Sequence, residues 1–293
     1  MIKLSIIIVT YNSLQHIFNC LESIYQFNDL EQDDFEIIIV ENGSLESFNE
    51  MSRHVSDKYG ERIKMVKNEQ NKGYGQGNNV GVRLASGKYI CIANPDIIFK
   101  APVFKKALKL FKENKQLAMI GGKQSGGRNS SFLNRPEYDF FILTAFLSDS
   151  LNKINLYFQK FFYLSGALLF IDKDKFFEIG LFDESFFLYF EESDITQRFL
   201  KKKYSTKFIK EFTYDHFIGD RSITVEETFD IEIDSVKKYC LKYDFSFKSF
   251  VNKRILSYKI MKFLFKIIGK EERVRTSEIY LSRYLKIKKN HYK

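Results

Sequence analysis

The first hundred residues alternate short apolar, β-branched runs with segments whose apolar residues recur at helical spacing. The runs 4–9, 35–40, 63–66 and 89–93 predict four strands. The first run is almost continuously apolar and does not alternate with polar residues, so we expect a strand covered on both faces, as in a parallel sheet. The helical segments between them predict a β-α-β-α order with right-handed crossovers. The sequence therefore predicts a Rossmann-like, mostly parallel α/β sheet flanked by helices.

Polar residues follow three of these predicted strands, at 10–12, 41–44 and 94–96. In open α/β sheets, ligands bind beyond the carboxyl ends of the strands. A run rich in Gly and Asn at 71–81 precedes a predicted helix. Its glycines would let backbone N–H groups approach a diphosphate closely, although a plain loop with a helix cap explains them too. We expect a binding site at this edge of the sheet.

The second half of the chain has a weaker pattern. Residues 121–134 are rich in Gly, Ser and Asn and predict a loop between a donor half and an acceptor half. Residues 161–171 predict one more strand. Residues 179–198 combine a turn, an acidic cluster and a helix start. Beyond about residue 225 the sequence predicts basic helices.

Charge is unevenly distributed along the chain. From residue 237 onward, 17 Lys and Arg face 4 Asp and Glu, a net of +13, which leaves −4 for the rest. An acidic body with a basic tail does not indicate a nucleic-acid binder, whose basic surface lies on the folded domain. It suits an enzyme at an anionic membrane face. No run reaches the ~18 apolar residues of a transmembrane helix, and three widely spaced cysteines indicate a reducing cytoplasm.

Six stretches follow one another along the chain: SIIIVTYN at 5–12, VENGS at 40–44, NKGYGQGNN at 71–79, NPD at 94–96, LSGA at 164–167 and GLFDESFFLYFEESD at 180–194. In this order they resemble the motifs of family 2 glycosyltransferases, particularly the bacterial rhamnosyltransferase-like branch. The resemblance covers roughly residues 4–222. It implies a GT-A type fold and sugar transfer with inversion.

The resemblance implies where a nucleoside-diphosphate sugar would bind. The family normally carries Asp after the second strand, accepting from the N3–H of uracil or thymine; this chain has Glu41 there. A dTDP- or UDP-sugar is therefore the expected donor. The expected donor contacts are Thr10, Tyr11, Asn12, Glu41, Asn42, Asn71, Gly73, Gly77, Asn78, Asn94 and Asp96.

The Asn-Pro-Asp stretch looks like the family's version of its Asp-x-Asp metal motif, with Asp96 as its carboxylate. A leaving diphosphate needs a sink for its charge, and a divalent cation held by carboxylate supplies one. We therefore expect Mn²⁺ or Mg²⁺. His216 precedes Gly219 and Ser222, resembling the family's His-x-x-Gly-x-x-Ser, and is a second candidate for the metal or the diphosphate.

The acidic cluster implies a catalytic base for the acceptor hydroxyl. The family's base is an Asp at the position of Glu192, with Glu191 as a competitor. Ser165, Gly166 and Asp194 are expected on the acceptor side. For Asp194, a helix cap or an ion pair with Arg198, four residues on, is the alternative.

Residues 251–268 in the basic tail combine an apolar and a cationic pattern. Apolar residues between 251 and 268 recur at helical spacing beside several lysines. This predicts an interfacial helix on anionic lipid, with packing between protomers as the alternative.

We expect a domain at 1–225, with a nucleotide-sugar half at 1–120 and an acceptor half at 121–225. A basic helical region would follow at 226–293. The predicted activity is inverting transfer of rhamnose or a hexose to a hydroxyl of a lipid-linked glycan. This would serve O-antigen or capsule synthesis at the cytoplasmic face of the membrane. A nucleotide-sugar-binding protein with impaired catalysis is the alternative. No Gly-x-Gly-x-x-Gly follows the first strand, which argues against a dinucleotide enzyme.

Overall fold

The computed structural model describes residues 1–125, 130–139, 142–216 and 225–291. In this part of the chain, eight strands form one sheet in the order β3-β2-β1-β4-β9-β6-β10-β5. The strands are β1 Leu4–Thr10, β2 Phe35–Asn42, β3 Ile63–Asn68, β4 Tyr89–Ala93, β5 Ile97–Phe99, β6 Leu117–Ser125, β9 Leu168–Asp172 and β10 Ser205–His216. Strands β7 Phe132–Asn134 and β8 Phe162–Leu164 pair separately.

The sheet is mostly parallel, as expected. Strands β3, β2, β1 and β4 run parallel, and β10 runs parallel to β6. Strand β9 is antiparallel to both β4 and β6, and β5 is antiparallel to β10. The sheet is therefore mixed, with the four predicted strands forming its parallel half.

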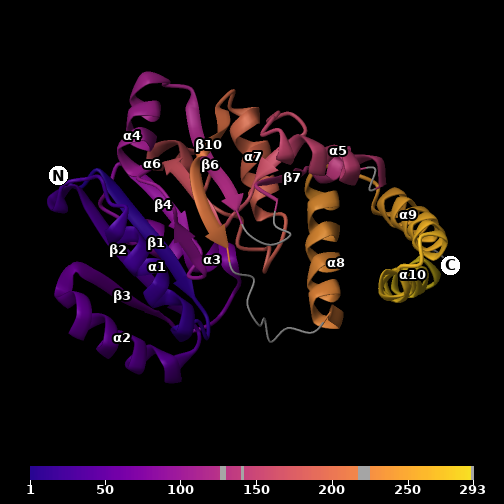
Figure 1. Ribbon diagram of the computed structural model, residues 1–293, viewed down its shortest axis with the longest axis horizontal. Helices are drawn as coiled ribbons and strands as arrows, with labels where there is room; N and C mark the ends of the chain where they lie inside the picture. The colour runs from indigo at the N-terminus through magenta and orange to yellow at the C-terminus, as the bar shows by residue number, and fades with distance from the viewer. Residues whose placement is uncertain (126–129, 140–141, 217–224, 292–293) are drawn as a thin grey trace.

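Helices cover both faces of the sheet (Figure 1). In β1, Ile6 and Ile8 face a core shared with α1, α2 and α4, whereas Ile7 faces a core shared with α3, α6 and α7. Burial on both faces explains the continuous apolar runs. The helices are α1 Leu14–Gln26, α2 Leu45–Tyr59, α3 Tyr74–Leu84, α4 Phe104–Glu113, α5 Ile142–Lys153, α6 Lys173–Glu178 and α7 Glu191–Lys201.

Three further helices follow, α8 Val225–Lys242, α9 Phe247–Ile267 and α10 Glu271–His291, as the sequence predicted. They share a small core of their own, in which Phe229 and Val236 of α8 join Val251 of α9 and Tyr284 of α10. Figure 1 shows α9 and α10 beside each other at the end of the molecule away from β3. None of the described helices is long and apolar enough to cross a bilayer.

Two sequence expectations were wrong. The predicted loop at 121–134 contributes its first five residues to β6 and its last three to β7, while 126–129 lie outside the described residues. In β6 a glycine is needed at position 122 because of close packing: a Cβ there would lie 2.2 Å from the carbonyl oxygen of Phe212. The single strand predicted at 161–171 is two strands, β8 and β9, separated at 165–167.

Candidate active site

The structure brings Asp96 and His216 together. Asp96 lies in the turn between β4 and β5, and His216 is the last residue of β10, which pairs with β5 so that His216 lies opposite Ile97. The Oδ1 of Asp96 is 3.2 Å from the Nε2 of His216, and both side chains are largely buried. The amide of Asn94 lies 3.4 Å from the same ring nitrogen. Gly219 and Ser222, the other residues of the His216 motif, lie outside the described residues.

This pair has the chemistry and spacing of two metal ligands. Neighbouring ligands of an octahedral ion at about 2.1 Å lie about 3 Å apart, close to the observed separation of 3.2 Å. In the described part of the chain, no group of three or more His, Cys, Asp or Glu could hold a metal. Two protein ligands would leave positions for phosphate oxygens and water, as is usual for Mg²⁺. The residues present therefore fit Mn²⁺ or Mg²⁺ held jointly with a diphosphate.

Thr10 and Glu41 meet at the ends of β1 and β2, where they lie directly opposite each other. Both side chains are buried, and the Thr10 hydroxyl donates to Glu41 Oε2 over 2.5 Å. The Ser44 hydroxyl donates to Glu41 Oε1. The Tyr11 ring beside them is 51% exposed. Asn12 adopts a left-handed conformation, and its N–H donates to Ser44.

The glycine-rich segment is joined to the end of β2 by Asn42. Its amide donates to Asn71 Oδ1 over 3.0 Å and to the carbonyl of Gly73 over 3.2 Å. Gly73 has a φ of +103°, and a Cβ there would lie 2.0 Å from the Phe187 carbonyl oxygen. A Cβ on Gly77 would lie 2.8 Å from Val9. Close packing therefore requires glycine at both positions, and their contact with a diphosphate stays a prediction.

Asn78 lies on the first turns of α3, almost fully buried. Its amide donates to the Tyr74 carbonyl over 2.9 Å. Among the described residues its Oδ1 has no hydrogen-bond partner. A buried amide oxygen without a partner is unusual in a folded protein, which makes it a candidate acceptor for a ligand donor.

Glu191 and Glu192 open helix α7 after two left-handed residues, Tyr189 and Phe190. Glu191 is 1% exposed and Glu192 is half-buried. Burial and the neighbouring Glu192 charge raise the pKa of Glu191 well above its ordinary value. Burial raises the pKa of Glu192 to about 7, although backbone hydrogen bonds at positions 192 and 166 act in the opposite direction. A carboxyl with a pKa near the operating pH suits general base catalysis.

Segment 165–167 lies between Glu192 on one side and Asn94, of the Asn-Pro-Asp turn, on the other. A Cβ on Gly166 would lie 2.1 Å from Glu192 Oε1, and the Tyr74 hydroxyl donates to the Gly166 carbonyl over 2.7 Å. One residue on, the carbonyl of Ala167 accepts from the Asn94 N–H over 2.9 Å. The same short segment therefore contacts Glu192 and Asn94. Tyr74 was missed by the sequence reasoning, because nothing local marks a tyrosine whose partner is 92 residues away.

Asp194 is buried in an ion-pair network, whereas a residue that contacts the acceptor was expected at this position. Its side chain is fully buried and pairs with Arg198 at 2.6 Å, which confirms the alternative ion pair. Its Oδ1 accepts from Lys242 Nζ and Tyr243 Oη, each over 2.6 Å. Asp194 thus links α7 to the end of α8.

Helix α8 also bonds to the segment before α7. The Ser235 hydroxyl donates to the Leu188 carbonyl over 2.7 Å, and the Ser193 hydroxyl donates to Tyr239 Oη over 3.0 Å. The Phe190 ring packs against Tyr239. Helix α8 therefore contacts the segment that carries Glu191 and Glu192. The predicted domain boundary at residue 225 stays a prediction.

A family model described as Glycosyl transferase family 2 matches residues 5–180. A 112-residue stretch is 30% identical to an uncharacterized glycosyltransferase of Rickettsia bellii, covering 38% of this chain and 15% of that protein. A 119-residue stretch is 27% identical to a poly(ribitol-phosphate) beta-glucosyltransferase of Bacillus spizizenii, covering 41% of this chain and 19% of that protein. The chain thus spans less than a fifth of the length of either relative.

The fold is similar to that of the mannosyltransferase PcManGT from Pyrobaculum calidifontis, solved with GDP-Man and Mn²⁺. The TM-score is 0.58 over 75% of this chain and 58% of that one, at 16% identity. At this identity the likeness shows a shared fold alone. It confirms the expected α/β architecture with flanking helices.

Proposed function

The chain belongs to glycosyl transferase family 2, and from this membership we propose that it moves a sugar from a nucleoside-diphosphate sugar to an acceptor hydroxyl, with inversion. The observation that carries the proposal is the double contact of segment 165–167. Gly166 lies against Glu192, and Ala167 is hydrogen-bonded to Asn94, two residues before Asp96. Glu192 and the turn that carries Asp96 thus border one short piece of chain, which supports placing the proposed base near the proposed diphosphate site.

The donor would lie along the carboxyl ends of β1, β2 and β4. Glu41, fixed by Thr10 and Ser44, would accept from the N3–H of a uracil or thymine ring. The exposed Tyr11 ring is available to stack on that base. Asn12, Asn42, Asn71, Gly73, Gly77 and Asn78 are proposed to border the ribose, diphosphate and sugar. The unsatisfied Asn78 oxygen would accept from a sugar hydroxyl.

Asp96 and His216 would hold the metal. Mn²⁺ or Mg²⁺ bound there supplies positive charge to a diphosphate as it leaves. Asn94, whose amide approaches His216, would keep the imidazole in place. The 3.2 Å approach of Asp96 to His216 supports this assignment.

Glu192 is proposed as the base that takes the proton of the acceptor hydroxyl. It is more exposed than Glu191, and its pKa of about 7 lets it be ionised at neutral pH while still able to accept a proton. Glu191 is 1% exposed, and burial and the neighbouring Glu192 charge hold its pKa well above the ordinary value, so it is the less accessible and the less readily ionised of the two carboxyls. Ser165 and Gly166 would face the acceptor sugar.

For the finer identity we propose a rhamnose or hexose donor with dTDP or UDP. The acceptor would be a glycan hydroxyl, lipid-linked, in bacterial surface polysaccharide synthesis such as O-antigen or capsule. The reaction would take place in the cytoplasm at the inner membrane face, without nucleic acid as a partner. Residues 1–225 would carry the activity, and 226–293 would form the basic helical region.

The metal assignment is tested by Asp96→Asn with Asp215→Asn as the matched control. Asp215 precedes His216, is similarly buried and pairs with Lys100 at 2.7 Å on the neighbouring surface. We expect Asp96→Asn to lower Mn²⁺-dependent transfer about 100-fold or more, because a lost ligand removes charge stabilisation of several kcal/mol. Asp215→Asn should keep most of the activity. Equal rates in the two variants would remove Asp96 from the metal site.

The base is tested by Glu192→Gln and Glu191→Gln, with donor affinity measured by calorimetry beside the transfer rate. Glu192→Gln should lower kcat by about 10²–10⁴-fold with donor affinity unchanged, as expected for loss of a general base. Glu191→Gln should retain measurable turnover. The reverse pattern would make Glu191 the base. Donor binding without turnover in the wild-type protein across a panel of acceptors would favour the non-catalytic binding protein.

A further inference from the structure

Helix α9 has two apolar faces. Val251, Ile255 and Tyr258 face α8 and α10 and belong to the C-terminal core. On the other side Leu256, Ile260, Phe263, Leu264 and Ile267 are between 39% and 66% exposed. At 3.6 residues per turn these five positions fall on one side of the helix. We call them the outer stripe.

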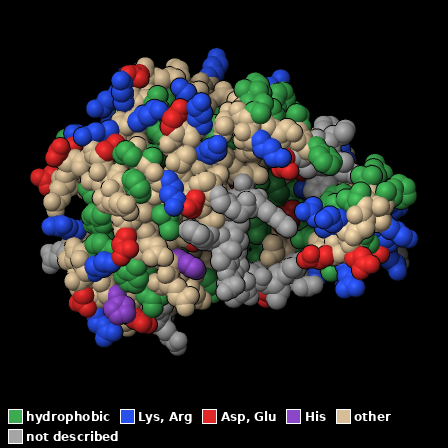
Figure 2. All heavy atoms as spheres, in the orientation of Figure 1, with side chains coloured by type: hydrophobic (Ala, Val, Ile, Leu, Met, Phe, Trp, Pro, Cys, Tyr) green, Lys and Arg blue, Asp and Glu red, His purple; other side chains and the backbone are tan. Residues whose placement is uncertain are grey.

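The outer stripe is bordered by positive charge. Lys259 precedes Ile260, Lys266 precedes Ile267, and both lysines are exposed. The sequence of α9 contains six Lys and Arg residues and neither Asp nor Glu. Figure 2 shows hydrophobic side chains gathered over α9 with Lys and Arg beside them. A contiguous exposed apolar surface next to cations is typical of an interaction site, not of a solvated helix face.

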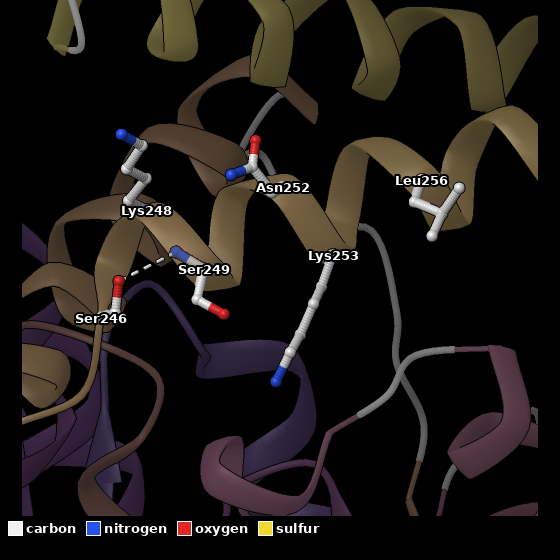
Figure 3. Close-up of a pocket in the computed structure, with 6 residues that line it drawn as sticks. All are labelled: Ser246, Lys248, Ser249, Asn252, Lys253 and Leu256. Carbon is white, nitrogen blue, oxygen red and sulfur yellow. Dashed lines mark hydrogen bonds between the residues drawn. The ribbon is translucent and has the colours of Figure 1, made fainter.

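A hollow of about 430 Å³ opens at the start of the same helix. Figure 3 shows it bordered by Lys248 and Lys253, with Leu256 at its far end. Since Leu256 is also the first residue of the outer stripe, the hollow continues directly into the apolar surface. The remaining lining residues are Ser246, Ser249 and Asn252.

We infer that the outer stripe docks on an anionic lipid bilayer, with the apolar side chains at the acyl boundary. The lysines and the hollow would contact headgroup phosphates. A second copy of the chain is a poorer occupant, because symmetric pairing of the outer stripes would bring the exposed Lys259 and Lys266 of one copy close to the same cations of the other. The inference does not depend on the proposed catalytic roles, so it is tested without an activity assay.

The chain contains no Trp, so one substitution creates a unique fluorescent reporter. Phe263→Trp places it in the outer stripe at a 64% exposed position. With vesicles of phosphatidylcholine and phosphatidylglycerol, its emission should shift to the blue and be quenched by brominated lipid. Phe177→Trp on α6, at a 46% exposed position, is the control and should show neither change. An unshifted Phe263→Trp spectrum would overturn the proposal.

Sedimentation with the same vesicles separates the two components of docking. Lys259→Glu with Lys266→Glu should lower the partition coefficient at least about tenfold, since each cation near an anionic surface contributes about 1 kcal/mol. Phe263→Ser with Ile267→Ser should lower it similarly, whereas Lys64→Glu, at an exposed position of β3, should change it little. Binding to pure phosphatidylcholine as strong as to the mixture would also overturn it. So would concentration-dependent dimers, seen by light scattering, that the stripe variants abolish.

Discussion

At the residue scale, the proton affinity of Glu192 is set by opposing influences. Burial beside Glu191 disfavours the carboxylate, and backbone hydrogen bonds at positions 166 and 192 favour it. The family resemblance could point to position 192 from the sequence. It could not indicate the contact with Gly166, because that contact depends on how β8, β9 and α7 pack together.

The transfer rate should rise with pH through about 7. A general base acts in its ionised form, and the raised pKa of Glu192 keeps it protonated at lower pH. A pH profile of kcat in the wild-type protein should therefore show an acidic limb with an apparent pKa near 7. A flat profile between about pH 5 and about pH 9, two units on either side of that value, would contradict Glu192 as the base.

The raised pKa of Glu191 carries a consequence for stability with the opposite pH trend. A carboxyl whose pKa is higher in the folded than in the unfolded chain stabilises the fold below its unfolded pKa. That contribution is lost as the pH rises through the folded value. Glu191→Gln should therefore raise the free energy of unfolding relative to wild type at alkaline pH more than at acidic pH. Urea titrations of both proteins, one at acidic and one at alkaline pH, measure this difference in the free energy of unfolding.

Gly166→Ala tests the contact that joins the two halves of the site. Its Cβ would meet Glu192 Oε1 at 2.1 Å and displace the carboxylate. A displacement of about 1 Å can cost about 100-fold in rate, so kcat should fall while donor affinity stays. Gly269→Ala is the control for lost stability: its methyl group meets nothing within 4 Å, but the φ of +66° strains the backbone there, so stability should fall while kcat is kept. Full activity in Gly166→Ala would show that the carboxylate can move without loss.

At the element scale, the strands predicted from sequence are those whose signal is local. Strands β1, β2 and β4 contain continuous apolar runs, whereas β3 carries two lysines; β1 pairs in parallel with both β2 and β4, so the carboxyl ends of these three strands meet as predicted. Strand β10 shows no such run, and its pairing with β6 is interrupted by two register shifts. Strand β9 lies between β4 and β6, which are far from it in sequence. Patterns within a window cannot show such pairings, and this is why Asp96 and His216 could be brought together only through the resemblance.

Helix α8 should act on catalysis through the segment before α7. Ser235→Ala removes the hydrogen bond to Leu188, just before two left-handed residues, and should cost about 1 kcal/mol of unfolding free energy. It should also lower kcat more than it raises KM for the donor, because the donor residues lie on other elements. Ser277→Ala removes a similar buried hydrogen bond, 2.8 Å long, within α10 and should leave kcat unchanged. Equal kcat in both variants would limit α8 to a structural role.

At the scale of the whole molecule, the C-terminal helices complete a core and cannot be removed cleanly. Without α9 and α10, the buried Phe229 and Ile233 of α8 would lose the neighbours that cover them. A chain ending at residue 246 should therefore unfold at a lower temperature and bind more of a hydrophobic dye than the full chain. An unchanged melting temperature would show that α8 stays folded against residues 1–216 without α9 and α10.

Helix α8 contacts the segment of Glu191 and Glu192 through Ser235 and Tyr239, and it shares a core with α9 through Val236 and Val251. If α9 rests on lipid, this arrangement sets the distance between the bilayer and the segment that carries Glu191 and Glu192. The height of Glu192, the proposed base, above the bilayer would then be fixed by the contacts of α8 with both parts. Among lipid-borne acceptors of increasing length, the preferred one would be that whose hydroxyl stands at this height.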